Sequence, residues 1–313
     1  MTAAMTRYVH PEAQAIIDRA ALSTETMETM TPAEARAASD TRVMNAPLPK
    51  PDIAQVRNVV MPGPAGDLRL RLYLPEAEAP PGYCMFFHGG GFMLGTLETH
   101  DALCRQLASR AAVAVVAVEF RLAPEHRCPA ASDDCLAATR WVHAHAAELG
   151  LNPARFAVAG ESSGGNLAAG VALRLRDGGP TPALQLLLYP LVEMTLSGQG
   201  YRDFAEGYLL TTVRSQFYVD GYLGPDGDAT DPRNSPLRDP HPEQAPPTFL
   251  LTAGLDPSTE DARTYGDRLR AAGVAVEEAR FEGWTHGFLF WGHADGSIAA
   301  LDRAAAALHA ALA

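Results

Sequence analysis

The sequence has few cysteines, no long apolar run and no excess of positive charge. Its four cysteines, Cys84, Cys104, Cys128 and Cys135, form no CxxC pair and no spacing with histidine that is typical of zinc. The pattern argues against a disulfide framework and a structural metal, and we expect neither a metal nor an organic cofactor. Cys84 and Cys104 stand in apolar stretches, where a cysteine usually acts as a small buried hydrophobic residue.

Membrane and export signals are also missing. The longest apolar run covers residues 111–118, far less than the roughly 20 residues that a membrane-spanning helix needs. Residues 1–11 contain no basic region followed by an apolar run, so no secretory signal is visible. We therefore expect a cytoplasmic location and no stable membrane insertion.

The charge balance bears on the class of partner. The chain carries 37 acidic against 25 basic residues, a formal net charge of −12, which argues against binding to nucleic acid. Hydrophobic residues make up 47% of its 313 positions, enough for a sizeable core. This length fits one large α/β domain or a domain with a smaller appendage, and the sequence leaves a homodimer open.

The first fifty residues are predicted to be helical. Residues 11–22 favour a helix, and a second begins at Thr31, where Pro32 and Glu34 complete a capping box. The proline-rich residues 46–51 then break the helical pattern and are interpreted as a linker.

Beyond the linker the pattern changes to a hairpin and then to buried strands alternating with helices. The hairpin is predicted at residues 56–61 and 68–74. Later strands are predicted at 83–88, 113–120, 155–160, 184–189, 248–253 and 274–281, and helices at 98–111, 131–149, 163–176, 258–272 and 297–311. Short apolar runs suit strands that are covered on both faces, so we expect an α/β fold with a mostly parallel central sheet flanked by helices.

One long interval interrupts this alternation. Residues 190–247 are rich in glycine, tyrosine, aspartate and proline, with one helical stretch at 213–223. An insertion of this size is usually functional. Together with the N-terminal helices it could form a lid over the ends of the strands.

The strongest chemical signal is residues 160–164, GESSG, between an apolar strand and an Ala/Leu-rich helix. This is the context of a nucleophile elbow, in which a strained turn exposes the Oγ of Ser162 and glycines avoid collisions. The alternative is a phosphate-binding turn, but GxGxxG and the Walker lysine are both missing.

A second signal is HGGGF at residues 88–92, directly after an apolar strand. Its glycines let the backbone N–H groups of Gly90 and Gly91 point at one spot, as an oxyanion hole requires. The third donor should be the N–H of Ser163, after the nucleophile. We expect His88 to brace this loop through hydrogen bonds.

These motifs, with RLAPEH at residues 121–126, Asp256-Pro257 and His286-Gly287-Phe288, resemble the bacterial hormone-sensitive-lipase family of esterases over nearly the whole chain. The resemblance implies an α/β-hydrolase fold with a helical cap. The division that follows is N-terminal cap helices at 1–50, a catalytic core at 51–190 and 247–313, and a cap insertion at 191–246.

The acid and the base are assigned by position. Asp256 lies just beyond a strand that ends in glycine, where the family places its acid, and His286 follows the last strand. The order Ser162, Asp256, His286 is that of α/β hydrolases. Glu260 and Asp261 fall in the following helix and are expected to be solvated. The same is expected of six histidines, namely His10, His100, His143, His145, His293 and His309.

The chain departs from the family pattern at several positions. Glu161 and Ser163 flank the nucleophile, where the family usually has aspartate and alanine. Since the donor at position 163 is a backbone N–H, serine there should not abolish the oxyanion hole. Phe120 replaces a tyrosine and loses a hydroxyl.

The sequence therefore predicts a serine carboxylic-ester hydrolase acting on small short- to medium-chain acyl esters. Two alternatives remain. An amide or peptide hydrolase could use the same triad on the same fold. A non-catalytic receptor is disfavoured, since plant gibberellin receptors of this architecture lack the catalytic histidine, which is present here.

Overall fold

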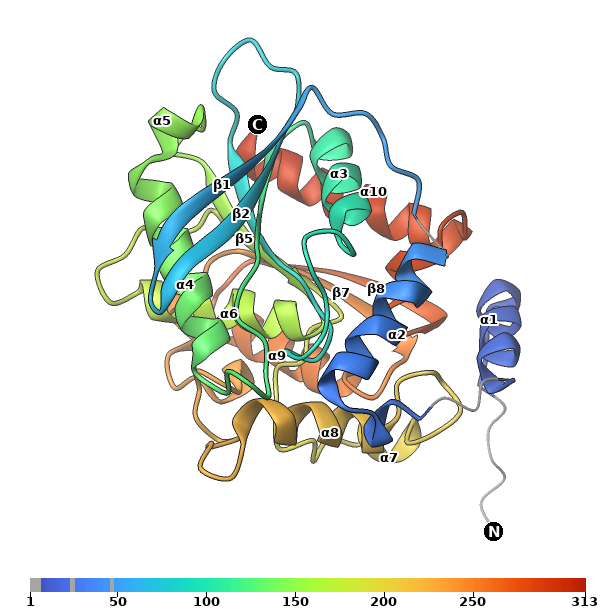
Figure 1. Ribbon diagram of the computed structural model, residues 1–313. Helices are drawn as coiled ribbons and strands as arrows, with labels where there is room; N and C mark the ends of the chain where they lie inside the picture. Colours follow the sequence, from blue (N-terminus) through green and yellow to red (C-terminus); the bar gives the residue numbers. More distant parts are fainter. Residues whose placement is uncertain (1–6, 23–25, 46–47) are drawn as a thin grey trace.

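The computed structural model describes residues 7–22, 26–45 and 48–313, and within these ranges the chain forms an eight-stranded sheet (Figure 1). The strand order is β1-β2-β4-β3-β5-β6-β7-β8. The predicted hairpin is present as β1 (Gln55–Gly63) and β2 (Gly66–Leu74), and β2 pairs antiparallel with β4 (Ala114–Val118). All other pairings are parallel, and each joins one strand to the next in this order. From β4 they run through β3 (Tyr83–Phe87), β5 (Phe156–Glu161), β6 (Leu184–Leu188) and β7 (Thr248–Leu255) to β8 (Val276–Thr285). The expectation of a mostly parallel sheet is confirmed.

Helices cover both faces of this sheet. Alternate residues of β3 show the division: Met85 and Phe87 belong to one apolar core, and Cys84 and Phe86 to the other. The first core is covered by α4 (Ala130–Ala144), α6 (Ser163–Leu175) and α9 (Thr259–Ala271), and the second by α3 (Asp101–Ala111) and α10 (Asp295–Leu312). Every residue of β3 and β4 is buried, which explains their uninterrupted apolar sequences.

Two predicted boundaries are wrong for local reasons. The helix expected at 131–149 is divided into α4 and α5 (Ala146–Leu149), because His145 leaves helical geometry and its Nδ1 bonds to the carbonyl of Trp141 at 2.8 Å. The last strand continues past 281 to Thr285, which pairs with Leu255 beyond an irregularity in the ladder. His286 therefore follows β8 directly.

The two regions outside the alternating pattern contain short helices. The N-terminal segment, residues 1–50, holds α1 (Pro11–Ala21), η1 (Met27–Thr29) and α2 (Pro32–Asn45), and the predicted capping box is present, with Thr31 N–H donating to Glu34 Oε2 at 2.9 Å. The insertion, residues 191–246, holds α7 (Gly200–Asp203), α8 (Thr212–Leu223), η2 (Pro236–Arg238) and η3 (Pro242–Gln244). Figure 1 shows α8 beside the start of α2, where η1 contacts α8. Residues 46 and 47 of the expected linker and residues 1–6 lie outside the described ranges.

Candidate active site

Ser162 occupies the turn between β5 and α6 in a strained conformation. Its φ is 57° and its ψ is −121°, a region that residues with a side chain rarely enter. The backbone N–H of Ser162 donates to the carbonyl of Leu188 at 2.9 Å, which fixes the turn on the neighbouring strand β6. The side chain is partly exposed although Glu161 and Ser163 beside it are buried.

Close backbone contacts explain the two glycines that flank this turn. A Cβ on Gly160 would overlap the carbonyl oxygen of Gly164, and a Cβ on Gly164 would overlap that of Phe87. A larger residue at 160 would force β5 away from α6, and one at 164 would force α6 away from the end of β3. The GESSG pattern is thus a packing requirement of the turn.

His286 and Asp256 complete a continuous hydrogen-bonded line with Ser162. His286 Nε2 lies 2.8 Å from Ser162 Oγ, and His286 Nδ1 lies 2.7 Å from Asp256 Oδ2. Asp256 is fully buried at the end of β7, and its other oxygen, Oδ1, accepts two hydrogen bonds from Ser258, each at 2.9 Å. The structure therefore brings together the three residues that the sequence predicted as a triad.

Two opposing effects act on the His286 ring. Burial acts to lower its pKa, but the charge and hydrogen bond of Asp256, helped by the charge of Glu161, outweigh burial and raise the pKa above its ordinary value. The ring of Tyr189 packs against the imidazole, with ring centroids 4.9 Å apart. A histidine held in this way is able to accept a proton from a neighbouring hydroxyl near neutral pH.

The glycine loop lies beside the elbow. Gly90 and Gly91 have φ values of 105° and 62°, a region that favours glycine. The loop closes on itself through hydrogen bonds from the N–H groups of Met93 and Leu94 to Gly90 O, at 3.1 and 2.9 Å. The N–H of Phe92 donates to Ser163 Oγ at 3.2 Å, which ties the loop to the first residue of α6. Gly90, Gly91 and Ser163 are thus brought to one end of the sheet, next to Ser162.

Comparison with known proteins shows the family to which the chain belongs. A family described by the alpha/beta hydrolase fold matches residues 84–290, which run from β3 through the loop, the elbow and His286. The chain belongs to this family. The resemblance to hormone-sensitive-lipase esterases drawn from the motifs is confirmed.

Similar proteins include several named esterases. Carboxylic ester hydrolase LipN of Mycobacterium tuberculosis is 42% identical over 250 residues, which cover 77% of this chain and 66% of LipN. Ethyl acetate hydrolase of Pseudomonas putida is 37% identical over 230 residues, 72% of each chain. Among solved structures, an alpha/beta hydrolase enzyme from the metagenome of Lake Arreo superposes with a TM-score of 0.93 at 37% identity, covering 97% of this chain and 98% of that one.

Behind the elbow, this α/β hydrolase buries a polar layer that the sequence did not reveal. His100, expected to be solvated, is only 6% exposed, and its Nε2 lies 3.1 Å from Glu161 Oε1. The expectation was wrong because His100 packs against His88 at the start of the glycine loop, with ring centroids 5.0 Å apart. His88 braces the loop as expected, with Nδ1 2.8 Å from Gly89 O, and burial lowers its pKa to about 3. Phe120, which lacks the family hydroxyl, stacks on His88 with centroids 4.2 Å apart.

Asp261 is a second correction. It was expected to be solvated in the helix after Asp256, but it is 8% exposed, and its Oδ2 has no hydrogen-bond partner among the described residues. Burial, with the nearby charge of Glu193, raises the pKa of Asp261 to about 6. The side chain faces the insertion, where a Cβ on Gly198 would overlap its carboxylate, so the contact depends on a distant segment.

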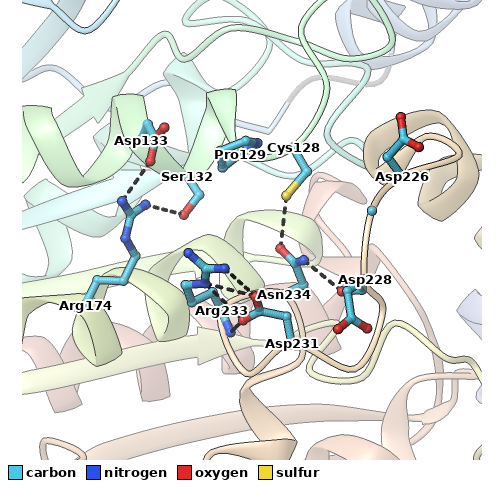
Figure 2. Close-up of a pocket in the computed structure, with 11 residues that line it drawn as sticks. Cys128, Pro129, Ser132, Asp133, Arg174, Asp226, Asp228, Asp231, Arg233 and Asn234 are labelled. Atoms are coloured by element: carbon cyan, nitrogen blue, oxygen red, sulfur yellow. Dashed lines mark hydrogen bonds and ion pairs between the residues drawn. The ribbon is translucent and has the colours of Figure 1, made fainter.

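A hollow of about 410 Å³ lies apart from the triad, between α4, α6 and the end of the insertion (Figure 2). Both arginines that line it are paired: Arg174 bonds to Asp133 at 2.7 Å and Arg233 to Asp231 at 2.5 Å. The thiol of Cys128 donates to Asn234 Oδ1 at 3.1 Å. We therefore assign this hollow no part in the chemistry at Ser162.

Residues 7–22, 26–45 and 48–313 hold no clustered metal ligands and no membrane-spanning helix. In that part of the chain, no group of three or more His, Cys, Asp or Glu side chains is arranged to hold a metal ion. No helix among them has both the length and the apolarity needed to cross a bilayer. The four cysteines are free thiols.

Proposed function

We propose that this α/β hydrolase is a serine carboxylic-ester hydrolase that uses Ser162 as nucleophile, His286 as general base and Asp256 as the acid that orients it. The observation that carries the proposal is the unbroken line from Asp256 through His286 to Ser162, with both links at hydrogen-bond distance. Asp256 accepts the Nδ1–H of His286, which leaves Nε2 free to take the Ser162 proton as Oγ attacks the ester carbonyl. The esterase names of the relatives support ester hydrolysis.

The proposed reaction proceeds in two halves. In the first, His286 returns the proton to the leaving alcohol and an acyl group stays on Ser162. In the second, His286 takes a proton from water as the water oxygen attacks the acyl carbon; the bond to Ser162 Oγ then breaks, the acid leaves, and His286 returns the proton to Oγ. In both, the backbone N–H groups of Gly90, Gly91 and Ser163 hold the negative oxygen of the tetrahedral intermediate, each contributing about 3 kcal/mol.

We further propose that the N-terminal segment and the insertion form a cap over the core at 51–190 and 247–313. Large side chains of the insertion are buried, with Tyr201 3% and Tyr222 1% exposed, and the ring of Tyr222 stacks on Phe92 of the glycine loop with centroids 3.9 Å apart. A cap that lies so close to the glycine loop leaves room for short acyl chains. For this reason we propose short- to medium-chain esters as substrates. The name of the Pseudomonas putida relative, ethyl acetate hydrolase, agrees with this choice.

Matched chromogenic substrates test the reaction class. Nitrophenyl and nitroanilide derivatives of the same acyl group differ only in the leaving atom, so their kcat/KM values separate ester from amide hydrolysis. We expect turnover of the butyrate ester and little release from the anilide. Faster release from the anilide would favour the amide or peptide hydrolase. Two further expectations stay predictions. Cell fractionation would test the cytoplasmic location, and light scattering would test for a homodimer.

A further inference from the structure

The loop that carries the proposed oxyanion donors is held from outside the core by an arginine of α2. Arg36 Nε donates to the carbonyl of Met93 at 2.9 Å, and Arg36 Nη2 donates to the carbonyl of Ala123 at 2.9 Å. Met93 lies two residues after Gly91. Ala123 belongs to the RLAPEH segment, and its own N–H donates to Phe92 O at 2.9 Å. One guanidinium thus joins two loops that already contact each other.

Glu125 fixes the orientation of this guanidinium. Arg36 Nη1 donates to Glu125 Oε1 at 2.9 Å, and Arg36 Nη2 donates to Oε2 at 2.6 Å. Such a two-point pair is geometrically selective, and a lysine could not make it while also reaching two carbonyl groups. The hydrogen bond from Arg36 lowers the pKa of Glu125 below its ordinary value, although half of the carboxylate side chain is exposed.

The insertion holds the same loop from another side. A Cβ on Gly91 would overlap the ring of Tyr218 in α8, so this ring lies directly on the Gly91 backbone. The hydroxyl of Tyr218 donates to Met27 Sδ at 3.0 Å, and Arg214, one turn earlier in α8, pairs with Glu28 at 2.8 Å. These contacts lock the insertion to the N-terminal segment above the loop.

We propose that Arg36 is a positioning residue: from the N-terminal segment it sets the oxyanion loop in the place where the N–H groups of Gly90 and Gly91 meet the developing oxyanion. The inference rests on the function proposed above and extends it, since the cap then acts on the transition state as well as on the shape of the acyl pocket. A loop displaced by a fraction of an ångström weakens hydrogen bonds that form only in the transition state. The same displacement of the loop leaves binding of the ester in its ground state nearly unchanged.

Replacement of Arg36 by methionine tests the proposal, because methionine keeps an unbranched stem and removes all four hydrogen bonds. We expect kcat to fall about ten-fold with KM nearly constant, since loss of a whole oxyanion donor costs roughly 10²–10³ and a displaced donor costs less. The loss should be the same for acetate, butyrate and hexanoate nitrophenyl esters, because every one of them forms the same oxyanion. Arg36→Lys should show most of the same loss of kcat. This variant tests the proposal if the methionine variant does not fold.

Arg202→Met is the matched control. Arg202 also lies in the proposed cap, but its guanidinium donates to Gln199 and to the carbonyl of Ser197, both within the insertion. Its kcat should match that of the unaltered protein. Glu125→Gln should also lower kcat, and much less so when Arg36 is already methionine, because the two side chains act as one unit.

Two results would overturn the proposal: a kcat of the Arg36 variants equal to that of the Arg202 control, or a loss confined to the longer acyl chains. The second would mean that Arg36 only shapes the acyl pocket. Ser162→Ala, assayed beside these variants, keeps the outcomes distinguishable. If Ser162→Ala is inactive and Arg36→Met is fully active, the triad stands and the bracing role fails. If the unaltered protein hydrolyses no ester, the proposed function itself fails.

Discussion

Ser163 Oγ accepts the backbone N–H of Phe92 at 3.2 Å and thereby joins the nucleophile elbow to the glycine loop. The hydroxyl supports the loop, whereas the backbone N–H of the same residue is the proposed third oxyanion donor. Ser163→Ala should therefore keep the backbone N–H donor and lose the hydrogen bond that joins the elbow to the glycine loop. We expect kcat to fall a few-fold, far less than the roughly 10²–10³ that removal of an oxyanion donor costs. Steady-state kinetics on a nitrophenyl ester will check this, and a loss above a hundred-fold would mean that the hydroxyl does more than hold the loop.

The pH dependence follows from the environment of His286. The proposed base, His286, must be neutral to act, so kcat/KM should fall in acid as it becomes protonated. Because Asp256 raises the pKa of His286, the acid limb should lie above the ordinary histidine value of 6.5. Asp256→Asn should move the acid limb of the kcat/KM profile to lower pH and reduce kcat by about 10⁴. A profile that is flat from about pH 5 to 9 would contradict a histidine base.

We expect the buried carboxylate of Asp261 to make the folded protein less stable at neutral pH. Its pKa is raised from 3.8 to about 6 by burial, so the unfolded chain releases this proton more readily than the folded chain. The stability that the protonated Asp261 contributes should therefore be lost as pH rises from about 4 to 6 and should stay lost above that window. Asp261→Asn should raise the free energy of unfolding at pH 7.5 by on the order of 1–3 kcal/mol, and the gain should disappear below about pH 4.

Urea unfolding at the two pH values measures this difference. Glu260→Gln serves as the matched control, because Glu260 is the neighbouring carboxylate and is partly exposed. It should change the stability by less than Asp261→Asn at either pH. A gain for Asp261→Asn that is equally large at pH 4 and pH 7.5 would show that the effect is not electrostatic.

The proposed cap makes a prediction about chain length. Turnover of nitrophenyl esters should fall from butyrate to palmitate, because buried aromatic side chains of the insertion lie against the glycine loop. Deletion of residues 1–40 should reduce activity on every ester, since it removes Arg36 as well as the contact of η1 with α8. Circular dichroism shows whether the core remains folded. Palmitate turnover equal to that of butyrate, or a folded truncation with unchanged rates, would contradict the cap.

The sequence predicted most of the site because its chemistry depends on local constraints. The elbow needs glycines at 160 and 164, the loop needs glycines at 90 and 91, and parallel strands bring their carboxyl ends to one edge. Ser162, Asp256 and His286 follow such elements directly, so motif and strand position were sufficient to find them.

The residues that were missed depend on contacts between distant segments. His100 is polar and stands before a helix, and no local pattern shows that it pairs with Glu161, 61 positions away. Arg36 sits in a helix with little apolar character, and its partners lie 57 to 89 positions along the chain. Asp261 is buried by the insertion, whose path the sequence does not specify. In each case the decisive partner belongs to another element.

Covalent labelling tests the central claim most directly. A fluorophosphonate reacts with a serine that is activated by a neighbouring base and mimics the tetrahedral intermediate. Intact-mass and peptide analysis of the labelled protein should show one phosphonyl group per chain, on Ser162, with activity lost in proportion. The Ser162→Ala variant should be unlabelled and lower in kcat by about 10⁶. Labelling of another residue, or a Ser162→Ala variant that retains esterase activity, would contradict the account.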